Sequence, residues 1–268
     1  MNYISTNHRG GIGNVLFKLA ASVSTAIDNN TEYLFSNEFI RDKDLAMVTK
    51  GFPDYRIYYP TMLRNISFLD RLPAPYITYT EPNFHYDPIP YTEGTNLVLD
   101  GGFQSEKYFK NNREKIIELF KIPDFLEEHI KKTLPSVSEY VSLHVRRGDY
   151  VWQPQYHPLT TKEFYQKAVE ELEKDRMYLI FSDDLEGCRE LLDFIPNKVF
   201  YETGEDWMDF YIMSLCGDNI IANSSFSWWA AYLNANTNKK VIAPSKWFGP
   251  AYEHFNTEDL IPETWIKL

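Results

Sequence analysis

Residues 140–150 read YVSLHVRRGDY, so that a run of strand-forming residues leads directly into two arginines. Short apolar runs follow at 177–181, 198–200, 219–222 and 240–243, and helical periodicity lies between most of them, at 161–173, 185–194, 206–215 and 226–234. Alternation of strands with helices is typical of βαβ units, which build a parallel sheet. Ligands of such sheets bind at the carboxyl ends of the strands. The two arginines therefore stand where a ligand is expected.

The first half of the chain shows the same α/β pattern less clearly. Residues 3–6 form a candidate strand, followed by a glycine-rich turn and a helical period over 16–27. Residues 97–99 predict a buried strand and 105–121 a helix, whereas 52–90 is rich in Pro, Tyr and Asn and has weak periodicity. We predict an α/β fold with mainly parallel sheets. A boundary near 133–138 divides it into an N-terminal half (1–135) and a C-terminal half (136–268).

The composition limits the class of ligand. The 268 residues carry a net charge of −11, which argues against broad contact with nucleic acid or anionic lipid, because such partners are bound through basic patches. Cys188 and Cys216 are the two cysteines, and so few favour free thiols in a reducing compartment. Neither a signal-peptide pattern nor a run long enough to span a bilayer is apparent. We expect a protein that is cytoplasmic or peripheral at a membrane.

The glycine-rich turn at 10–14, GGIGN, is the first candidate site. Glycines let backbone N–H groups approach an anion, and the N-terminus of the following helix adds a partial positive charge. Gly11, Gly13 and Asn14 are therefore candidate phosphate-binding residues. The alternative is a tight strand-to-helix turn that binds nothing.

The arginines after the strand at 140–145 are the second. A guanidinium group holds two phosphate oxygens at once and keeps its proton, so Arg146 and Arg147 suit a leaving diphosphate without a metal. The alternative is a structural ion pair between one arginine and Asp149. A metal-ligand role for His144 is disfavoured, because no second His or Cys stands at ligand spacing.

Two further segments follow strands in the same way. At 181–184, FSDD, Asp183 or Asp184 could accept hydrogen bonds from guanine, and the alternative is capping of the next helix. At 223–229, NSSFSWW, hydroxyl and free N–H groups at a helix start form a second candidate phosphate site. Its alternative is a Ser/Asn cap with a core Trp pair. Four such segments at strand ends favour a nucleotide-sugar as the ligand.

Together with GGFQSEKYF at 101–109, these segments resemble the bacterial and viral α-1,2-fucosyltransferases and their wider fucosyltransferase relatives. The motifs occur in the family's order over most of the chain. The resemblance implies a two-domain GT-B-like fold of two Rossmann-like halves, inversion at the anomeric carbon, and no metal or other cofactor. Val15, Lys18 and the region 55–91 depart from the family pattern, which leaves the acceptor open.

The resemblance also implies roles for individual residues. It places Arg146 at the β-phosphate with Arg147 close by, His144 and one of the two aspartates at guanine, and 225–227 along the phosphates. Asp149 is a candidate general base by its proximity in sequence. The predicted donor-binding set is Gly11, Gly13, Asn14, His144, Arg146, Arg147, Asp183, Asp184, Ser224, Ser225, Phe226 and Ser227; the predicted catalytic residues are Arg146 and Asp149, with no metal ligands.

The reaction that this resemblance implies is transfer of fucose from GDP-fucose to the 2-hydroxyl of a terminal galactose-type glycan acceptor. The C-terminal half, 136–268, is expected to bind the GDP-sugar, and the N-terminal half, 1–135, is expected to supply the acceptor contacts. Three alternatives stay open. The donor could be another GDP-6-deoxyhexose such as GDP-rhamnose. Asp42-Lys43-Asp44 has the form of a metal-binding Asp-x-Asp loop, although its charged surroundings favour a solvated surface. The protein could also bind sugars on this fold without turnover.

Overall fold

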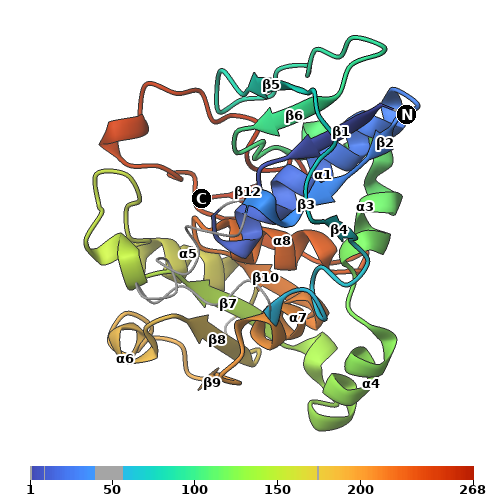
Figure 1. Cartoon of the computed structure of the whole chain (residues 1–268). Coiled ribbons are helices and arrows are strands. Elements are labelled where there is room, and N and C mark those ends of the chain that lie inside the picture. Colours follow the sequence, from blue (N-terminus) through green and yellow to red (C-terminus); the bar gives the residue numbers. More distant parts are fainter. Residues whose placement is uncertain (1, 9, 40–56, 174) are drawn as a thin grey trace. The chain divides into compact units, whose positions relative to one another are not determined.

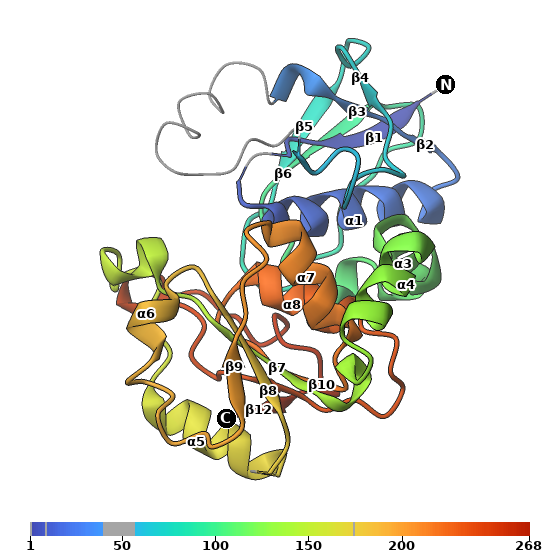
Figure 2. The same cartoon turned by 90° about the horizontal axis from the view of Figure 1, so that it is seen from below.

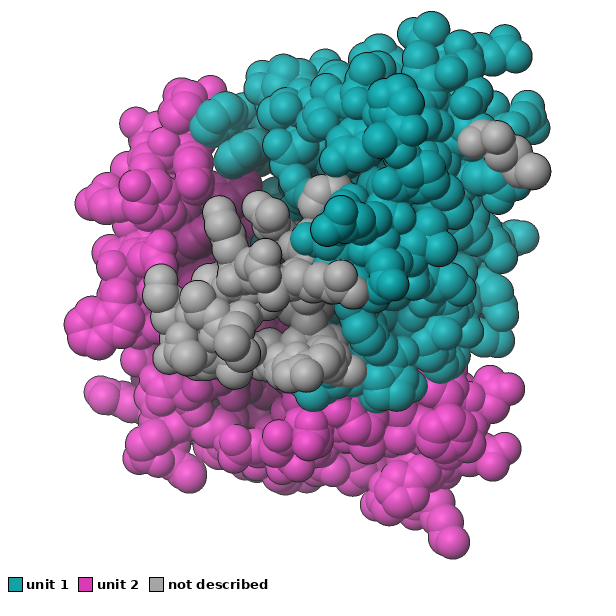
Figure 3. Space-filling model, in the orientation of Figure 1, with its two compact units in different colours: residues 1–121, 255–262 teal, residues 122–254, 263–268 magenta. Residues whose placement is uncertain are grey.

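The chain forms two compact α/β units. The computed structural model describes residues 2–8, 10–39, 57–173 and 175–268. Unit 1 comprises 1–121 and 255–262, and unit 2 comprises 122–254 and 263–268 (Figure 3). The sequence predicted a division at 135/136. In the structure, helix α4 (Asp124–Thr133) belongs to unit 2, where it packs against helix α7 (Asp206–Leu215).

Unit 1 is built on a four-stranded sheet in the order β2-β1-β6-β5, with every pairing parallel. Its strands are β1 (Tyr3–Thr6), β2 (Glu32–Tyr33), β5 (Ile77–Thr80) and β6 (Leu97–Asp100). The predicted first helix is present as α1 (Ile12–Asp28), which follows β1 and is buried along most of its length (Figure 1). A small parallel pair, β3 (Phe35–Ser36) with β4 (Phe68–Leu69), completes the described sheets of this unit.

The helix predicted over 105–121 is interrupted in the structure. Ser105 caps a 3₁₀ turn, η3 (Glu106–Tyr108), by accepting a hydrogen bond from the Lys107 N–H. A second 3₁₀ turn, η4 (Lys110–Asn112), precedes α3 (Arg113–Phe120). The break lies at Phe109, whose φ of −143° is not helical and lets its buried ring pack against Phe17. Burial of an aromatic side chain here outweighs continuation of the helix.

Unit 2 is built on a six-stranded sheet in the order β12-β11-β10-β7-β8-β9, again with every pairing parallel. Its strands are β7 (Val141–Val145), β8 (Tyr178–Ser182), β9 (Lys198–Phe200), β10 (Asp218–Ile220), β11 (Val241–Ala243) and β12 (Ile266–Lys267). The chain adds strands outward from β7 as far as β9, and then returns to the other side of β7 with β10. The strand order therefore reverses between β7 and β10, which is the position where sheets of this kind bind ligands.

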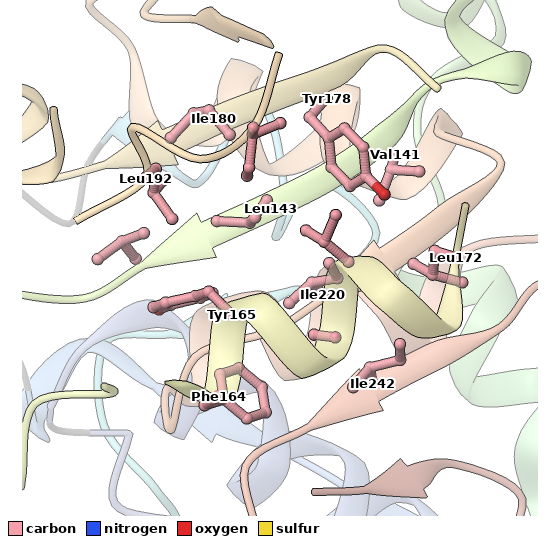
Figure 4. Packing of buried hydrophobic residues seen from close by; sticks show 14 of the residues in the cluster. Val141, Leu143, Phe164, Tyr165, Leu172, Tyr178, Ile180, Leu192, Ile220 and Ile242 are labelled. Carbon is pink, nitrogen blue, oxygen red and sulfur yellow. The ribbon is translucent and has the colours of Figure 1, made fainter. Parts of the chain in front are cut away.

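Helices cover both faces of this sheet, because successive side chains of a strand point to opposite faces. Val141 and Leu143 of β7 pack with Tyr165 of α5 (Lys162–Glu171) in one buried cluster (Figure 4). His144 points to the other face, where it contacts Ser227 of α8 (Ser225–Leu233). Helix α7 packs against α8 on that second face, whereas α5 lies on the first (Figure 2).

The predicted fold class, α/β with two Rossmann-like halves and mainly parallel sheets, is confirmed. Helix α6 (Leu185–Cys188) is shorter than the predicted 185–194, and short turns replace its second half. Cys188 and Cys216 are free, as predicted, and the structure shows that both are buried. Among the described residues, no helix is both long and apolar enough to cross a membrane.

Candidate functional site

Three of the four predicted segments meet at one edge of the unit 2 sheet. In the register of the sheet, Val145 is paired with Ser182 of β8, and Leu143 with Ile220 of β10. The residues that follow these strands, 146–147, 183–184 and 223–225, therefore leave neighbouring strands at their carboxyl ends. The two arginines lie at the centre of this edge, beside the point where the strand order reverses.

Asp183 is bound to both arginines. Its Oδ2 lies 2.7 Å from Nη1 of Arg146, and its Oδ1 accepts a hydrogen bond of 2.9 Å from the backbone N–H of Arg147. Gly148 makes this approach possible, because a Cβ at that position would overlap the Asp183 carboxylate. This contact was not predicted from the sequence, and it explains why the motif has a glycine at position 148.

Arg146 has a second carboxylate partner and an aromatic one. Its Nη2 donates to Oδ1 of Asp149 at 2.5 Å, and its guanidinium carbon lies 5.4 Å from the centroid of the Tyr150 ring. Burial lowers the pKa of Arg146, but the carboxylates of Asp183 and Asp149 outweigh burial and raise that pKa above its ordinary value. The predicted alternative, an ion pair with Asp149, is thus present. These two contacts use two of the five guanidinium N–H donors, so three remain for a ligand.

Arg147 is held by the second aspartate. Its Nε donates to Oδ2 of Asp184 at 2.7 Å, while Oδ1 of Asp184 accepts from the Gly187 N–H at 2.9 Å and caps α6. The hydrogen bonds from Arg147 and Gly187 lower the pKa of Asp184. Helix capping by this pair of aspartates was the alternative to guanine recognition, and Asp184 does cap. Guanine recognition by either aspartate stays a prediction.

The start of α8 offers free backbone N–H groups. Ser224 occupies the cap position, and its side chain makes no hydrogen bond to the helix. The first intrahelical hydrogen bond is donated by the Trp228 N–H to the Ser224 carbonyl. The N–H groups of Ser225, Phe226 and Ser227 precede that bond, so they are available to an anion. Trp228 is fully buried, as its predicted core role requires.

Asn223 fixes the loop that leads into α8. Its Nδ2 donates to the carbonyls of Pro158 and Trp247 at 2.9 and 3.0 Å, and its own carbonyl accepts from the Tyr150 hydroxyl at 2.9 Å. Asn223 is buried, with a relative exposure of 1%. The loop is therefore held in place from both sides before any ligand binds.

His144 is buried and uncharged. Its Nδ1 lies 2.9 Å from the Ser227 hydroxyl, and its ring centroid lies 5.8 Å from that of Phe226. Burial, and then the positive charge of Arg146, lower the pKa of His144 to about 3. It therefore acts as a neutral hydrogen-bonding group that links the end of β7 to the first turn of α8.

Two residues at this edge were missed by the sequence predictions. The ring of Tyr150, under the Arg146 guanidinium, stacks on His157 with centroids 4.6 Å apart. Burial raises the pKa of Tyr150 to about 12, with the charge of Arg146 opposing, so the phenol keeps its proton. Tyr150 ends the arginine motif and could have been suspected. No local pattern marks His157.

The fourth predicted segment belongs to unit 1 and is described by itself. Gly11 occupies the cap position of α1, and a glycine has no side chain that could cover the N–H groups of the first turn. Gly10 has a φ of +111°, a backbone conformation that favours glycine. Gly13 lies in the first turn of α1, where Oδ1 of Asn14 accepts from Nε2 of Gln104 at 2.9 Å. The helix N-terminus that the sequence predicted is present, and its contact with a ligand stays a prediction.

No three His, Cys, Asp or Glu side chains come together as a metal site in the part of the chain that the structure describes. Asp42 and Asp44, the alternative metal-binding pair, lie outside the described residues.

Comparison with known proteins identifies a family. Residues 53–268 match the family described as glycosyl transferase family 11. An α-1,2-colitosyltransferase of Escherichia coli is 26% identical over 100% of this chain and 99% of its own length. The O-antigen biosynthesis glycosyltransferase WbnK of Escherichia coli is 33% identical, but the match covers 62% of this chain and 59% of that protein. Galactoside α-(1,2)-fucosyltransferase 1 of Saimiri boliviensis boliviensis is 27% identical over 51% of this chain and 43% of that protein.

Solved structures also resemble the chain. The fucosyltransferase NodZ from Bradyrhizobium matches with a TM-score of 0.49 and 16% identity, covering 86% of this chain and 91% of that one. POFUT1 in complex with GDP matches with a TM-score of 0.47 and 12% identity, covering 89% and 96%.

Proposed function

The chain belongs to glycosyl transferase family 11, and from this premise we propose that it transfers a deoxyhexosyl group from a GDP-sugar, GDP-fucose in the first place, to the 2-hydroxyl of a galactose-type acceptor. The observation that carries the proposal is the arginine pair at the end of β7, beside the uncapped N-terminus of α8. Arginine pairs and helix N-termini commonly bind phosphate groups in proteins, and here they lie where the strand order of a parallel sheet reverses.

The proposed step is a single displacement at the anomeric carbon. The acceptor oxygen forms a bond to C1 as the bond from C1 to the β-phosphate oxygen breaks, and that electron pair leaves with GDP. The acceptor proton passes to a base or to water. Negative charge grows on the diphosphate, where the remaining N–H donors of Arg146 and the N–H groups of 225–227 stabilise it. Attack from the face opposite GDP inverts the configuration at C1.

The same groups support a step without a metal ion. Arg146 keeps its charge because Asp183 and Asp149 raise its pKa, so its remaining N–H groups can donate to the leaving diphosphate at any working pH. We expect GDP to bind with equal affinity in EDTA and in magnesium or manganese, as measured by calorimetry. Binding that requires the divalent ion would overturn this part of the proposal and direct attention to Asp42 and Asp44.

Asp149 is the proposed general base, and the structure adds a second role. Its Oδ1 is bonded to Arg146, and its side chain is 35% exposed. The Asp149→Asn variant separates the two roles. Loss of kcat with unchanged GDP affinity is expected of a base, whereas parallel loss of both would reduce Asp149 to a residue that positions Arg146.

Colitose is the second candidate for the transferred sugar. The relative that matches over its full length is named for α-1,2 transfer of colitose, whereas those named for fucose match over about half of this chain. Colitose is fucose without the 3-hydroxyl group. Both donors suit the same diphosphate site, and a hydrogen bond to that hydroxyl would separate them.

A donor panel tests the proposal. GDP-fucose, GDP-colitose and GDP-rhamnose are each incubated with lactose and N-acetyllactosamine, and the linkage of any product is assigned by NMR. We expect an α-1,2-linked product from one of the first two donors. A different linkage would overturn the regiochemistry. GDP release without a modified acceptor would indicate hydrolysis, and GDP binding without consumption of any donor would favour a sugar-binding protein.

A further inference from the structure

One tryptophan of unit 2 is exposed to solvent. Trp152 has a relative exposure of 85%, whereas Trp228 and Trp229 are at 0% and the remaining tryptophans are no more than partly exposed. Val151 and Tyr156, on the same loop, are also exposed, at 39% and 44%. Burial of an aromatic side chain of this size is favourable. Because Trp152 is exposed in the folded chain, the free energy of its burial is still available for binding a partner.

The loop that carries Trp152 is held firmly. At its start, the Trp152 N–H donates to the carbonyl of Asp149 at 3.1 Å. At its other end, the Gly249 N–H donates to the Tyr156 carbonyl at 2.7 Å. A Cβ on Gly249 would overlap the Gln155 carbonyl, so the glycine permits the close approach of the two segments. The indole is therefore presented by an ordered loop, the yellow-green segment before α5 in Figure 1.

The loop is continuous with the candidate donor site. Between Arg146 and Trp152 lie Asp149, which is bonded to Arg146, and Tyr150, whose hydroxyl donates to the Asn223 carbonyl. The same Tyr150 ring stacks on His157 at the far end of the loop. The loop that carries Trp152 is thus held both to the end of β7, through Asp149, and to the segment that leads into α8, through Tyr150.

A second substrate must lie beside the anomeric carbon of the donor, and its chemistry fits an indole platform. A pyranose ring has an apolar face of C–H groups and a rim of hydroxyls. An aromatic ring contacts the apolar face, and the polar side chain of Gln153, which is also exposed, can accompany it at the rim. The chain's net charge of −11 argues against an anionic membrane as the partner of this loop.

We propose that Trp152 is a stacking platform for the sugar acceptor and sets the enzyme's affinity for it. This inference rests on the proposed function and deepens it, since it assigns the acceptor to a loop of unit 2. The sequence predictions had assigned acceptor contacts to the N-terminal half.

Kinetics of matched variants test the proposal. Trp152→Ala should raise the acceptor KM by roughly tenfold, and Trp152→Phe should restore most of the affinity, because an aromatic face is retained. The Kd for GDP should be unchanged in both variants. Phe125→Ala is the control: Phe125 is 75% exposed on α4, and its removal should leave all constants as they are.

A fluorescence measurement provides a readout that does not depend on turnover. Trp152 should dominate quenching by acrylamide, because it is the most exposed described tryptophan. With GDP bound, addition of the acceptor that the donor panel identifies should protect it from quenching, and Trp152→Phe should lose that protectable component.

Two outcomes overturn the inference while leaving the proposed function intact. One is an unchanged acceptor KM in Trp152→Ala with normal GDP binding and transfer. The other is acrylamide quenching that saturating acceptor does not alter. Failure of the proposed function looks different, because GDP would then not bind or no donor would be consumed by the wild type.

Discussion

Asp183 and Arg146 form an ion pair of 2.7 Å across the carboxyl ends of β8 and β7. The pair fixes the guanidinium in place before a ligand binds, which reduces the loss of side-chain freedom on binding. With Asp149 and Asp184, three carboxylates surround two arginines. The local charge is therefore not strongly positive. In the proposed function, a diphosphate would therefore be recognised by directed N–H groups, and those in the first turn of α8 are available for this.

Arg146→Ala should reduce transfer about a hundredfold or more, because one charge-assisted contact to the developing diphosphate charge is lost. Arg146→Lys should restore little, since an ammonium group cannot hold Asp183, Asp149 and a phosphate in the same geometry. The measurements are kcat/KM, GDP affinity by calorimetry, and the melting temperature.

Arg189→Ala is the matched control for that experiment. Arg189 pairs with Glu186 on the exposed surface of unit 2, where such pairs contribute little. Near-normal transfer by Arg146→Ala would contradict its catalytic assignment. A collapsed melting curve would instead assign Arg146 a structural role, as the ion-pair alternative requires.

Gly148→Ala should weaken GDP binding without any change of charge. The added methyl group would overlap the Asp183 carboxylate, so the carboxylate must move away from Arg146 and the Arg147 N–H. The loss should appear in GDP affinity and in kcat/KM together. Gly102→Ala serves as the control, because a Cβ there meets its nearest neighbour at an ordinary 3.5 Å. Equal GDP affinity in the two variants would show that Asp183 does not position the arginines.

Asp183→Asn and Asp184→Asn should distinguish positioning of the arginines from recognition of guanine. Asp183 contacts both arginines, so Asp183→Asn should weaken the binding of GDP and the binding of ADP to the same extent. Asp184→Asn loses charge pairing with Arg147 but can still cap α6, because Asn caps a helix about as well as Asp, so its melting temperature should change little. Calorimetric titration with both nucleotides provides the comparison. A selective loss of GDP binding in either variant would assign that carboxylate to the base.

Local pattern was sufficient to predict the parallel sheet of unit 2 and to place the candidate ligand-binding residues at the ends of its strands. The periodicity of β7 and β8 is strong, and polar residues follow each strand directly. The contacts among those residues could not be predicted, because they join segments far apart in the chain. Gly187 is an example. A Cβ at this position would overlap the side chains of Asp184 and Arg147. Arg147 follows β7, a different strand, so this constraint on position 187 cannot be recognised from the local sequence.

Unit 1 was predicted less completely for a different reason. Phe103 adopts a φ of +49°, which residues with side chains seldom do, and the chain turns there before η3. Tertiary packing of Phe103 and Phe109, both at 0% exposure, determines this turn and the break that follows. Helical propensity over 105–121 therefore overestimated the length of the helix.

The buried His144 should make stability depend on pH. The pKa of His144 is about 3 in the folded protein and about 6.5 in the unfolded chain. Between these two pH values, His144 is protonated in the unfolded chain and neutral in the folded protein. This contribution to stability is fully present above pH 6.5, and it is lost by about 1.4 kcal/mol per pH unit as pH falls from 6.5 toward 3. Asp209 acts in the opposite sense: burial raises its pKa from 3.8 to about 6, so its contribution is lost as pH rises through 6.

Comparison of the wild type with His144→Asn isolates the histidine, because Asp209 is present in both and its effect cancels. Between pH 7 and pH 5, the wild type should lose about 2 kcal/mol more unfolding free energy than the variant, as measured by denaturant titration at each pH. His129→Asn is the control, since His129 is exposed on α4, and it should follow the wild type. If His144→Asn and the wild type show the same pH dependence, then His144 is charged in the folded protein. That result would contradict the proposal that a neutral His144 joins β7 to Ser227 by a hydrogen bond. It would also contradict the proposal that this hydrogen bond holds the first turn of α8 in place for the diphosphate.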